Sequence, residues 1–152
     1  MSPHTIEVFN QKPKNFHPKV EIAACYVEVE NDLLLLQIQP NKKEAGAWGV
    51  PAGKVEPDET PENGAIRELF EETGISVSHS QLHPLGHLYM RKPEIEYIYH
   101  MYRVHFNETP SVLLSSEHQS FKWASRDELK HLRLMAGAKE ALEKYLASLN
   151  AC

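Results

Sequence analysis

The sequence predicts an α/β fold in which helices pack on a mixed β-sheet. Segments rich in β-branched and aromatic residues precede, flank and follow one strongly marked helix, and a second long helix closes the chain. A length of 152 residues suits one domain, and no repeat, linker or low-complexity tract divides it. We therefore expect an irregular lead-in over residues 1–18 and a single domain over residues 19–150.

The first third of the chain predicts strands separated by turns. The lead-in contains prolines among polar residues, and we expect only one short edge strand there, near residues 6–9. Residues 20–29 are β-branched and aromatic, and an Asn-Asp turn then leads into a partner strand over residues 33–38. Residues 40–47 are polar and predict a surface loop before a short extended segment at residues 48–50.

The central helix has clear signals at both ends. Thr60 is a good N-cap residue, and Pro61 suits the first helical position because it has no backbone N–H to satisfy. Gly74 suits the left-handed position that follows a helix. The sequence therefore predicts a helix over residues 61–73.

The rest of the chain predicts further strands and two more helices. The expected strands span residues 76–77, 82–91, 94–107 and 121–123. Ser125 and Glu128 have the spacing of a capping box, which indicates a helix start. The last helix is expected over residues 134–149. One apolar stripe of this helix consists of Ala138, Leu142, Tyr145 and Leu149.

Composition excludes several classes of protein. Hydrophobic residues make up 41% and charged residues 24%, which is typical of a soluble domain and not of a disordered chain. The net charge of −5 offers no basic excess for nucleic acid, and no apolar run approaches the ~20 residues of a membrane span. We expect Cys25 to lie in the core and Cys152 to be a mobile thiol. This cysteine usage and the lack of a signal-peptide pattern predict a cytoplasmic protein.

The central helix carries an unusual acidic face. At about 100° per residue, Glu68, Glu71 and Glu72 share an arc of roughly 100°, with Gly64 between them. These carboxylates repel one another, and two of them lie at the negative end of the helix dipole. Clustered carboxylates are natural ligands of hard divalent cations, but a solvated charged face would look the same on helix geometry alone. The opposite, sheet-facing side consists of Ala65, Ile66, Leu69 and Phe70.

The spacing of residues 53–75 goes beyond helix geometry. Five residues separate Gly53 from Glu59, and seven more separate Glu59 from Arg67-Glu68-Leu69. One residue then precedes Glu71-Glu72, and one more precedes Gly74-Ile75. This segment resembles the signature box of the Nudix hydrolases at every defined position. At about 7% per fixed position, such a match arises by chance on the order of once in 10⁷ chains. The surrounding segments and the length also resemble a small, MutT-like Nudix domain.

The resemblance implies a fold, an activity and a cofactor. The fold would be an α/β/α sandwich around a mixed sheet. The activity would be hydrolysis of a diphosphate linkage in a nucleoside di- or triphosphate, or in a nucleoside diphosphate derivative, by attack of water at phosphorus. The cofactor would be Mg²⁺ or Mn²⁺, which neutralises the diphosphate and lowers the pKa of bound water.

The resemblance also implies roles for residues of the box. Glu71 and Glu72 would be metal ligands, and Glu68 would be a further ligand or the base that activates water. The backbone carbonyl of Ala52 would be another ligand. Arg67 would orient a catalytic glutamate. Glu68, Arg67, Glu71 and Glu72 are therefore the candidate catalytic residues.

One more acidic ligand is expected outside the box, shortly before a late tryptophan strand. Glu117 stands six residues before Trp123 and is the candidate, although an exposed loop acid would look the same. Glu94 and Glu96 are weaker rivals. Glu59 would be mainly structural, supporting the loop or binding metal through water.

The substrate stays open at this stage. The strand over residues 33–38 ends without the arginine of many MutT-like relatives, and Met90 stands where the ADP-ribose subgroup tends to have proline. We expect a small phosphorylated partner, a nucleotide, with no nucleic acid and no membrane, in a homodimer as is common in this family. Alternatives are a dinucleoside polyphosphate, ADP-ribose, a small organic diphosphate, a ligand-sensing domain without turnover, or isopentenyl diphosphate isomerisation.

Overall fold

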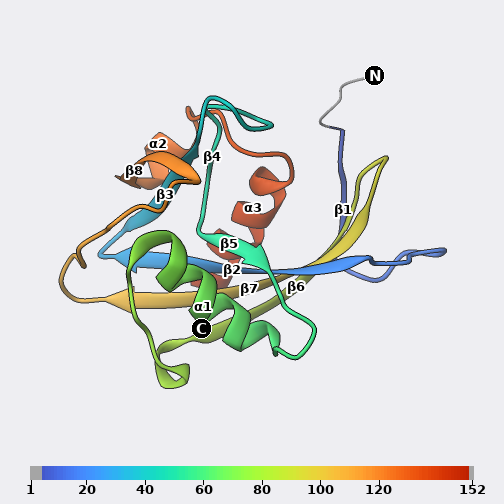
Figure 1. The fold of residues 1–152 in the computed structure, drawn as a ribbon, viewed down its shortest axis with the longest axis horizontal. Helices are drawn as coiled ribbons and strands as arrows, with labels where there is room; N and C mark the ends of the chain where they lie inside the picture. The colour runs from blue at the N-terminus through green and yellow to red at the C-terminus, as the bar shows by residue number, and fades with distance from the viewer. Residues whose placement is uncertain (1–4, 151–152) are drawn as a thin grey trace.

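The protein is built around one eight-stranded mixed sheet, which a computed structural model describes over residues 5–150 (Figure 1). The strand order is β1-β6-β7-β2-β3-β4, with β5 paired to β2 and β8 paired to β3. The strands are β1 (Glu7–Phe9), β2 (Val20–Val29), β3 (Asp32–Ile38), β4 (Trp48–Gly49), β5 (Ala52–Lys54), β6 (His83–Arg91), β7 (Glu96–Phe106) and β8 (His118–Ala124). The helices are α1 (Pro61–Thr73), the 3₁₀ helix η1 (His79–Gln81), α2 (Arg126–Leu129) and α3 (Ala138–Leu149).

Strand β2 is the centre of the sheet. It runs parallel to β7 along its whole length, from Val20 opposite Tyr97 to Val29 opposite Phe106. It also pairs antiparallel with β3 and with the short strand β5. Because helices cover both faces, a strand in this position needs apolar residues on both sides, as its sequence provides.

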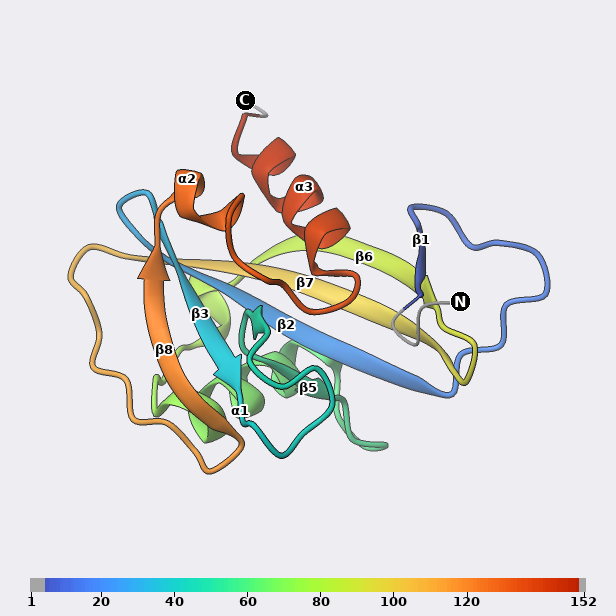
Figure 2. The same ribbon diagram turned by 90° about the horizontal axis from the view of Figure 1, so that it is seen from above.

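The helices form two layers, one on each side of the sheet (Figures 1 and 2). Ala23, Cys25 and Val27 of β2 belong to the cluster under α1, whereas Ala24 and Tyr26 belong to the cluster under α2 and α3. This alternation follows from the two-residue period of a strand. The arrangement is the expected α/β/α sandwich around a mixed sheet, and Cys25 is a core residue as predicted. Cys152 lies outside the described residues.

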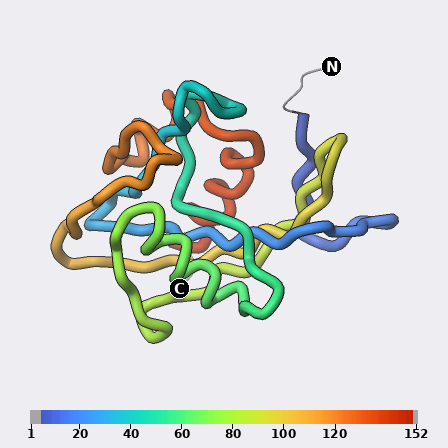
Figure 3. The backbone as a smooth tube through the Cα atoms, in the orientation of Figure 1, coloured from blue at the N-terminus to red at the C-terminus, as the bar shows by residue number. Residues whose placement is uncertain are grey.

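The lead-in adds an edge strand to the sheet. Glu7, Val8 and Phe9 pair antiparallel with the end of β6, so the expected edge strand is confirmed (Figure 3). Phe16 is buried and its ring packs edge-on against Tyr89, with ring centres 5.4 Å apart.

Three expectations were wrong in detail. Residues 76–77 form no strand, because no neighbouring strand of the described chain pairs with them. The last helix begins at Ala138 and not at residue 134, because residues 134–135 instead pair with Trp48 and Gly137 caps the helix in a left-handed conformation. Phe70 does not pack on the sheet: it is 51% exposed, since it lies at the margin of the apolar arc.

Helix α3 is tied to the sheet by a buried carboxylate. Glu28 accepts hydrogen bonds from the Tyr145 hydroxyl and from His105, and it pairs with Arg103 at 2.9 Å. Burial alone would raise the pKa of Glu28, but the hydrogen bonds from Arg103, Tyr145 and His105 outweigh it and lower that pKa. The network therefore stabilises the charged form of Glu28.

Within the described residues, no helix is both long and apolar enough to cross a bilayer.

Candidate active site

The site forms where β5 lies against α1. The helix starts as predicted, with the Thr60 hydroxyl accepting from the Asn63 amide at 3.1 Å, and it ends at Gly74 with φ 76°. Pairing with β2 then holds β5 beside the acidic face of this helix. A Cβ atom at Gly53 would overlap the Glu68 carboxyl group. A side chain at this position would therefore displace the Glu68 carboxyl group from its place beside the strand.

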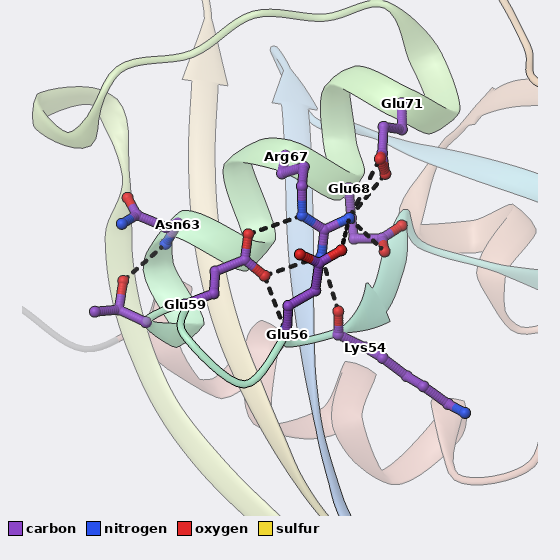
Figure 4. A network of polar contacts seen from close by, with 8 residues as sticks. Lys54, Glu56, Glu59, Asn63, Arg67, Glu68 and Glu71 are labelled. Carbon is purple, nitrogen blue, oxygen red and sulfur yellow. Dashed lines mark hydrogen bonds and ion pairs between the residues drawn. The ribbon is translucent and has the colours of Figure 1, made fainter.

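Arg67 is the centre of the polar network (Figure 4). Its Nε and Nη2 atoms donate to the two carboxylate oxygens of Glu59 at 2.7 and 2.9 Å. Its Nη1 atom donates to Glu71 at 2.8 Å and to Glu68 at 3.1 Å. Nη2 also donates to the backbone carbonyl of Lys54 at 2.9 Å. A planar guanidinium can make this many contacts, which an ammonium group cannot reproduce.

Glu59 is held in its charged form by Arg67. The two-point hydrogen bond from the guanidinium lowers the pKa of Glu59 to about 2, and its Oε1 also accepts from the Glu56 amide at 3.0 Å. The buried Gly64 leaves the space for this carboxylate, since a Cβ there would stand 3.1 Å from it. Glu59 thus joins the loop of residues 55–59 to the helix, which agrees with the structural role expected for it.

Glu72 is a buried acid. It is only 4% exposed, and its Oε1 accepts a hydrogen bond from the Ala52 amide at 3.1 Å. Burial, followed by the negative charge of Glu68 and then that of Glu117, raises the pKa of Glu72 to about 9. Burial also raises the pKa of Glu68. The acidic face is therefore strongly disfavoured electrostatically, as the sequence predicted.

The loop before β8 brings Glu117 to the site. Two backbone amides of this loop donate to backbone carbonyls at the end of α1. The Leu113 amide donates to the Thr73 carbonyl at 2.8 Å, and the Ser115 amide donates to the Glu72 carbonyl at 3.3 Å. Glu117 is consequently near enough for its charge to raise the pKa of both Glu68 and Glu72.

The two rival acids lie elsewhere. Glu96 pairs with Arg91 at 2.5 Å and accepts from the His17 amide at 2.8 Å. Glu94 and Glu96 both line an open depression near the β6–β7 turn. Of the three acids considered outside the box, the structure brings only Glu117 to the acidic helix.

The donor set suits a hard cation by its chemistry. Carboxylates and a backbone carbonyl are the oxygen ligands that Mg²⁺ and Mn²⁺ prefer, and the crowding around Glu72 is of the kind a cation relieves. In the described part of the chain, however, no three acidic, histidine or cysteine side chains converge on one point. Glu68 and Glu71 turn toward Arg67 instead.

Cys25 plays no visible part in this chemistry. Its thiol points to the Ala65 carbonyl at 3.7 Å, and burial raises its pKa to about 12. A protonated core thiol is a poor nucleophile. The isomerase alternative, which needs a reactive cysteine, therefore gains no support from this residue.

Sequence reasoning did not single out the apolar cavity on the far side of β5. The cavity lies between the sheet and the segment that leads into α3, and Ala52, Gly53 and Lys54 form part of its wall. The alternation of Tyr97 and Tyr99 on β7 was the available signal, but it also fitted simple core packing.

Comparisons with known proteins agree with this architecture. The crystal structure of the MutT protein from Methanosarcina mazei Go1 superimposes with a TM-score of 0.76 at 27% identity, covering 88% of this chain and 97% of that chain. The CTP pyrophosphohydrolase of Escherichia coli strain K12 is 30% identical over 131 residues, which is 84% of this chain and 92% of the relative. These matches place the protein among the hydrolases.

The family assignment is narrower. The model of the NUDIX domain matches residues 18–145. The oxidized purine nucleoside triphosphate hydrolase of Mus musculus is 36% identical over 88 residues, covering 56% of this chain and 53% of that relative. The chain belongs to the Nudix family and is a Nudix hydrolase. The acidic helix and the glycine-containing strand described above carry the residues that resemble the family's signature box.

Proposed function

We propose that the protein is a divalent-metal-dependent hydrolase of a diphosphate linkage in a nucleoside di- or triphosphate, or in a nucleoside diphosphate derivative. One observation carries the proposal: a buried carboxyl group, Glu72, is crowded by the acids Glu68 and Glu117 at a glycine-lined strand. A cation and a phosphate substrate would together balance this charge. Relatives named for hydrolysis of CTP and of oxidised purine nucleoside triphosphates support the substrate class.

The metal would be Mg²⁺ or Mn²⁺. Glu68, Glu71, Glu72, the Ala52 carbonyl and Glu117 would hold it. When bound, it would neutralise the diphosphate and lower the pKa of the attacking water. The carboxylates of Glu68 and Glu71, which contact Arg67, would be shared between the guanidinium and the cation.

The chain's own groups would then position the reaction. Arg67 holds Glu68 and Glu71 at fixed places on the helix, since it is itself anchored by Glu59 and by the Lys54 carbonyl. Glu68 would act either as a further ligand or as the base that accepts the proton of the attacking water. Attack at one phosphorus breaks the anhydride bond and leaves two phosphorylated products.

Phosphate release from a substrate panel tests the proposal. The panel would hold nucleoside triphosphates, ADP-ribose, dinucleoside polyphosphates and small organic diphosphates, each with Mg²⁺ and with Mn²⁺. Parallel assays with added pyrophosphatase or phosphatase identify the bond that breaks. Turnover that is abolished by Glu72→Gln supports the proposal. Folded protein that binds Mn²⁺ by calorimetry yet hydrolyses nothing on the panel contradicts it and favours a ligand-sensing domain.

Three further features belong to this proposal. We propose a cytoplasmic enzyme, which the buried free thiol of Cys25 supports, since such thiols suit a reducing compartment. The net charge of −5 supports a small-molecule partner over nucleic acid. We also propose a homodimer, which light scattering coupled to size-exclusion chromatography tests directly.

A further inference from the structure

Two histidines lie opposite each other on neighbouring strands of the sheet, outside the site described above. Strands β6 and β7 run side by side (Figure 2). His87 of β6 and His100 of β7 are direct partners in their antiparallel register, and the two ring centres are 5.7 Å apart. Directly opposite side chains of such a pair share one face of the sheet. The backbone therefore holds two imidazole rings beside each other.

The pair lies on the same face of the sheet as α1 and is accessible from solvent. His100 is level with Ala23 of β2, which packs in the cluster under α1. His87 is exposed, and the His100 side chain is 17% exposed. A small ion can therefore reach both rings from solvent.

Each ring is held by a hydrogen bond at its Nε2 atom. The Nε2 atom of His100 lies 2.6 Å from a carboxylate oxygen of Glu21, near the start of β2. The Nε2 atom of His87 lies 3.0 Å from the Tyr89 hydroxyl. Among residues 5–150, no hydrogen bond engages the Nδ1 atom of either ring. Each ring therefore keeps its Nδ1 atom for another partner.

Glu21 fixes the position of the proton on His100. A carboxylate only accepts hydrogen bonds, so the Nε2 atom of His100 donates, and in the neutral ring the Nδ1 atom carries the lone pair. Histidines that bind metal ions commonly donate their other ring N–H to a carboxylate, which sets the tautomer and makes the ring a stronger ligand. The Tyr89 hydroxyl can take the same place behind His87 by accepting from its Nε2 atom.

The spacing of the two rings fits one ion between them. A tetrahedral ion with metal–nitrogen distances of about 2.0–2.1 Å sets the two ring centres about 5 Å apart. The observed separation of 5.7 Å differs from this by less than about 1 Å. The rings are tilted by 53° to each other, and the torsion that turns a histidine ring is soft. Small side-chain rotations therefore suffice to aim both Nδ1 atoms at one ion.

We propose that His87 and His100 bind one divalent transition-metal ion through their Nδ1 atoms, with Glu21 supporting His100 and water completing the coordination. Structural metal sites generally use four protein ligands. Among the described residues, no third histidine, cysteine or acidic side chain joins the pair in such a closed site. The ion is therefore bound in exchange with the solution and is not a permanent part of the fold.

The type of ligand separates this site from the acids of α1. Imidazole nitrogen suits Zn²⁺, Cu²⁺ and Ni²⁺, whereas carboxylate and carbonyl oxygens suit Mg²⁺ and Mn²⁺. The affinity of a given site rises from Mn²⁺ through Co²⁺ to Ni²⁺. In excess Mg²⁺, we therefore expect the histidine pair to bind Ni²⁺ more tightly than Co²⁺, and Co²⁺ more tightly than Mn²⁺.

Histidine NMR locates the ion without relying on turnover. Untagged protein labelled with ¹⁵N-histidine is titrated with Zn²⁺ in excess Mg²⁺, and long-range ¹H–¹⁵N spectra report on each ring nitrogen. The Nδ1 signals of His87 and His100 should shift together. The signals of His105, which bonds to Glu28 on the opposite face of the sheet, should stay in place. Absence of shifts, shifts of only one ring of the pair, or shifts of other histidines instead would overturn the proposal.

Calorimetry with Ni²⁺ in excess Mg²⁺ measures what each group contributes. Glu21→Gln removes only the charge behind His100 and should weaken binding about 10-fold. His87→Gln and His100→Gln each remove a ligand and should weaken binding further. His83→Gln is the matched control, because His83 lies on the same strand opposite Arg103, and it should bind as the wild type does. Unchanged affinity in any of the first three variants would overturn the assignment, as would Ni²⁺ binding that excess Mg²⁺ abolishes.

Discussion

Replacing Glu72 by glutamine separates the effect of this buried carboxyl group on folding stability from its role in turnover. The side chain is 4% exposed, accepts from the Ala52 amide and lies near two further acids. Glutamine has nearly the same shape and keeps an oxygen for the Ala52 amide, but it carries no charge at any pH. In metal-free protein, we therefore expect Glu72→Gln to fold and to be more stable than the wild type at neutral pH.

The size of the effect follows from the pKa of Glu72, which rises from 4.5 to about 9 on folding. Because the folded protein holds this proton more tightly than the unfolded chain, the contribution of Glu72 to stability is complete below about pH 4.5. It is lost progressively as the pH rises toward 9. Each pH unit corresponds to about 1.4 kcal/mol, so the metal-free wild type loses roughly 3 kcal/mol by pH 7. The glutamine variant does not lose this stability, because glutamine does not ionise.

Urea unfolding followed by circular dichroism in EDTA measures this difference at pH 5, 7 and 8.5. The stability gain of Glu72→Gln over the wild type should grow with pH. Glu71→Gln is the matched control, because the Glu71 side chain is 52% exposed and contacts Arg67. That variant loses a contact with Arg67 and should be no more stable than the wild type. A constant difference between Glu72→Gln and the wild type across this range would refute the reasoning, as would wild-type turnover in the folded variant.

Three more predictions concern the residues around the site and below α3. Gly53→Ala places a methyl group in the Glu68 carboxyl, so we expect a loss of about 1–3 kcal/mol in urea unfolding together with reduced turnover. Arg67→Lys keeps the charge but loses the two-point contact, and unfolding should show a loss of about 1–3 kcal/mol, with unchanged stability as the contrary result. Tyr145→Phe removes a hydrogen-bond donor from Glu28. Because the pKa of Glu28 is lowered in the folded protein, its charged form stabilises the fold above the ordinary titration range of a glutamate, and this stabilisation is lost in acid. The acid-unfolding midpoint of the Tyr145→Phe variant should therefore lie at higher pH than that of the wild type, and an unmoved midpoint would contradict the role of this contact.

Local signals were enough to predict the elements that begin and end by local rules. Helix α1 runs between Thr60 and Gly74 as predicted, because both caps act within one turn of the helix. Strand β2 has its predicted limits, since its apolar run is bounded by a proline and a turn. The acidic face was also visible in the sequence, because residues three and four apart share one side of a helix.

Tertiary contacts explain what the sequence did not reveal. Residues 134–136 have helical propensity, yet the backbone of residues 134–135 pairs with Trp48, a contact that no local pattern indicates. The placement of Glu117 depends on loop amides that donate to the end of α1. Arg67 was expected only to orient a catalytic glutamate, because its contacts to Glu59 and Lys54 need the loop to fold back on the helix.

Strand β5 limits which substitutions this protein can accept. Its residues serve the acids on one side and the cavity on the other, so a substitution there alters both at once. Residues 134–138, which form the opposite wall of the cavity, contact Glu44 through the Ala136 amide. Among the described residues, they make no hydrogen bond or ion pair to the acids of α1. Mutation of that wall can therefore reshape the cavity while the contacts among the acids stay intact. One wall of the cavity is free to change, and the other is constrained by its contacts with the acids.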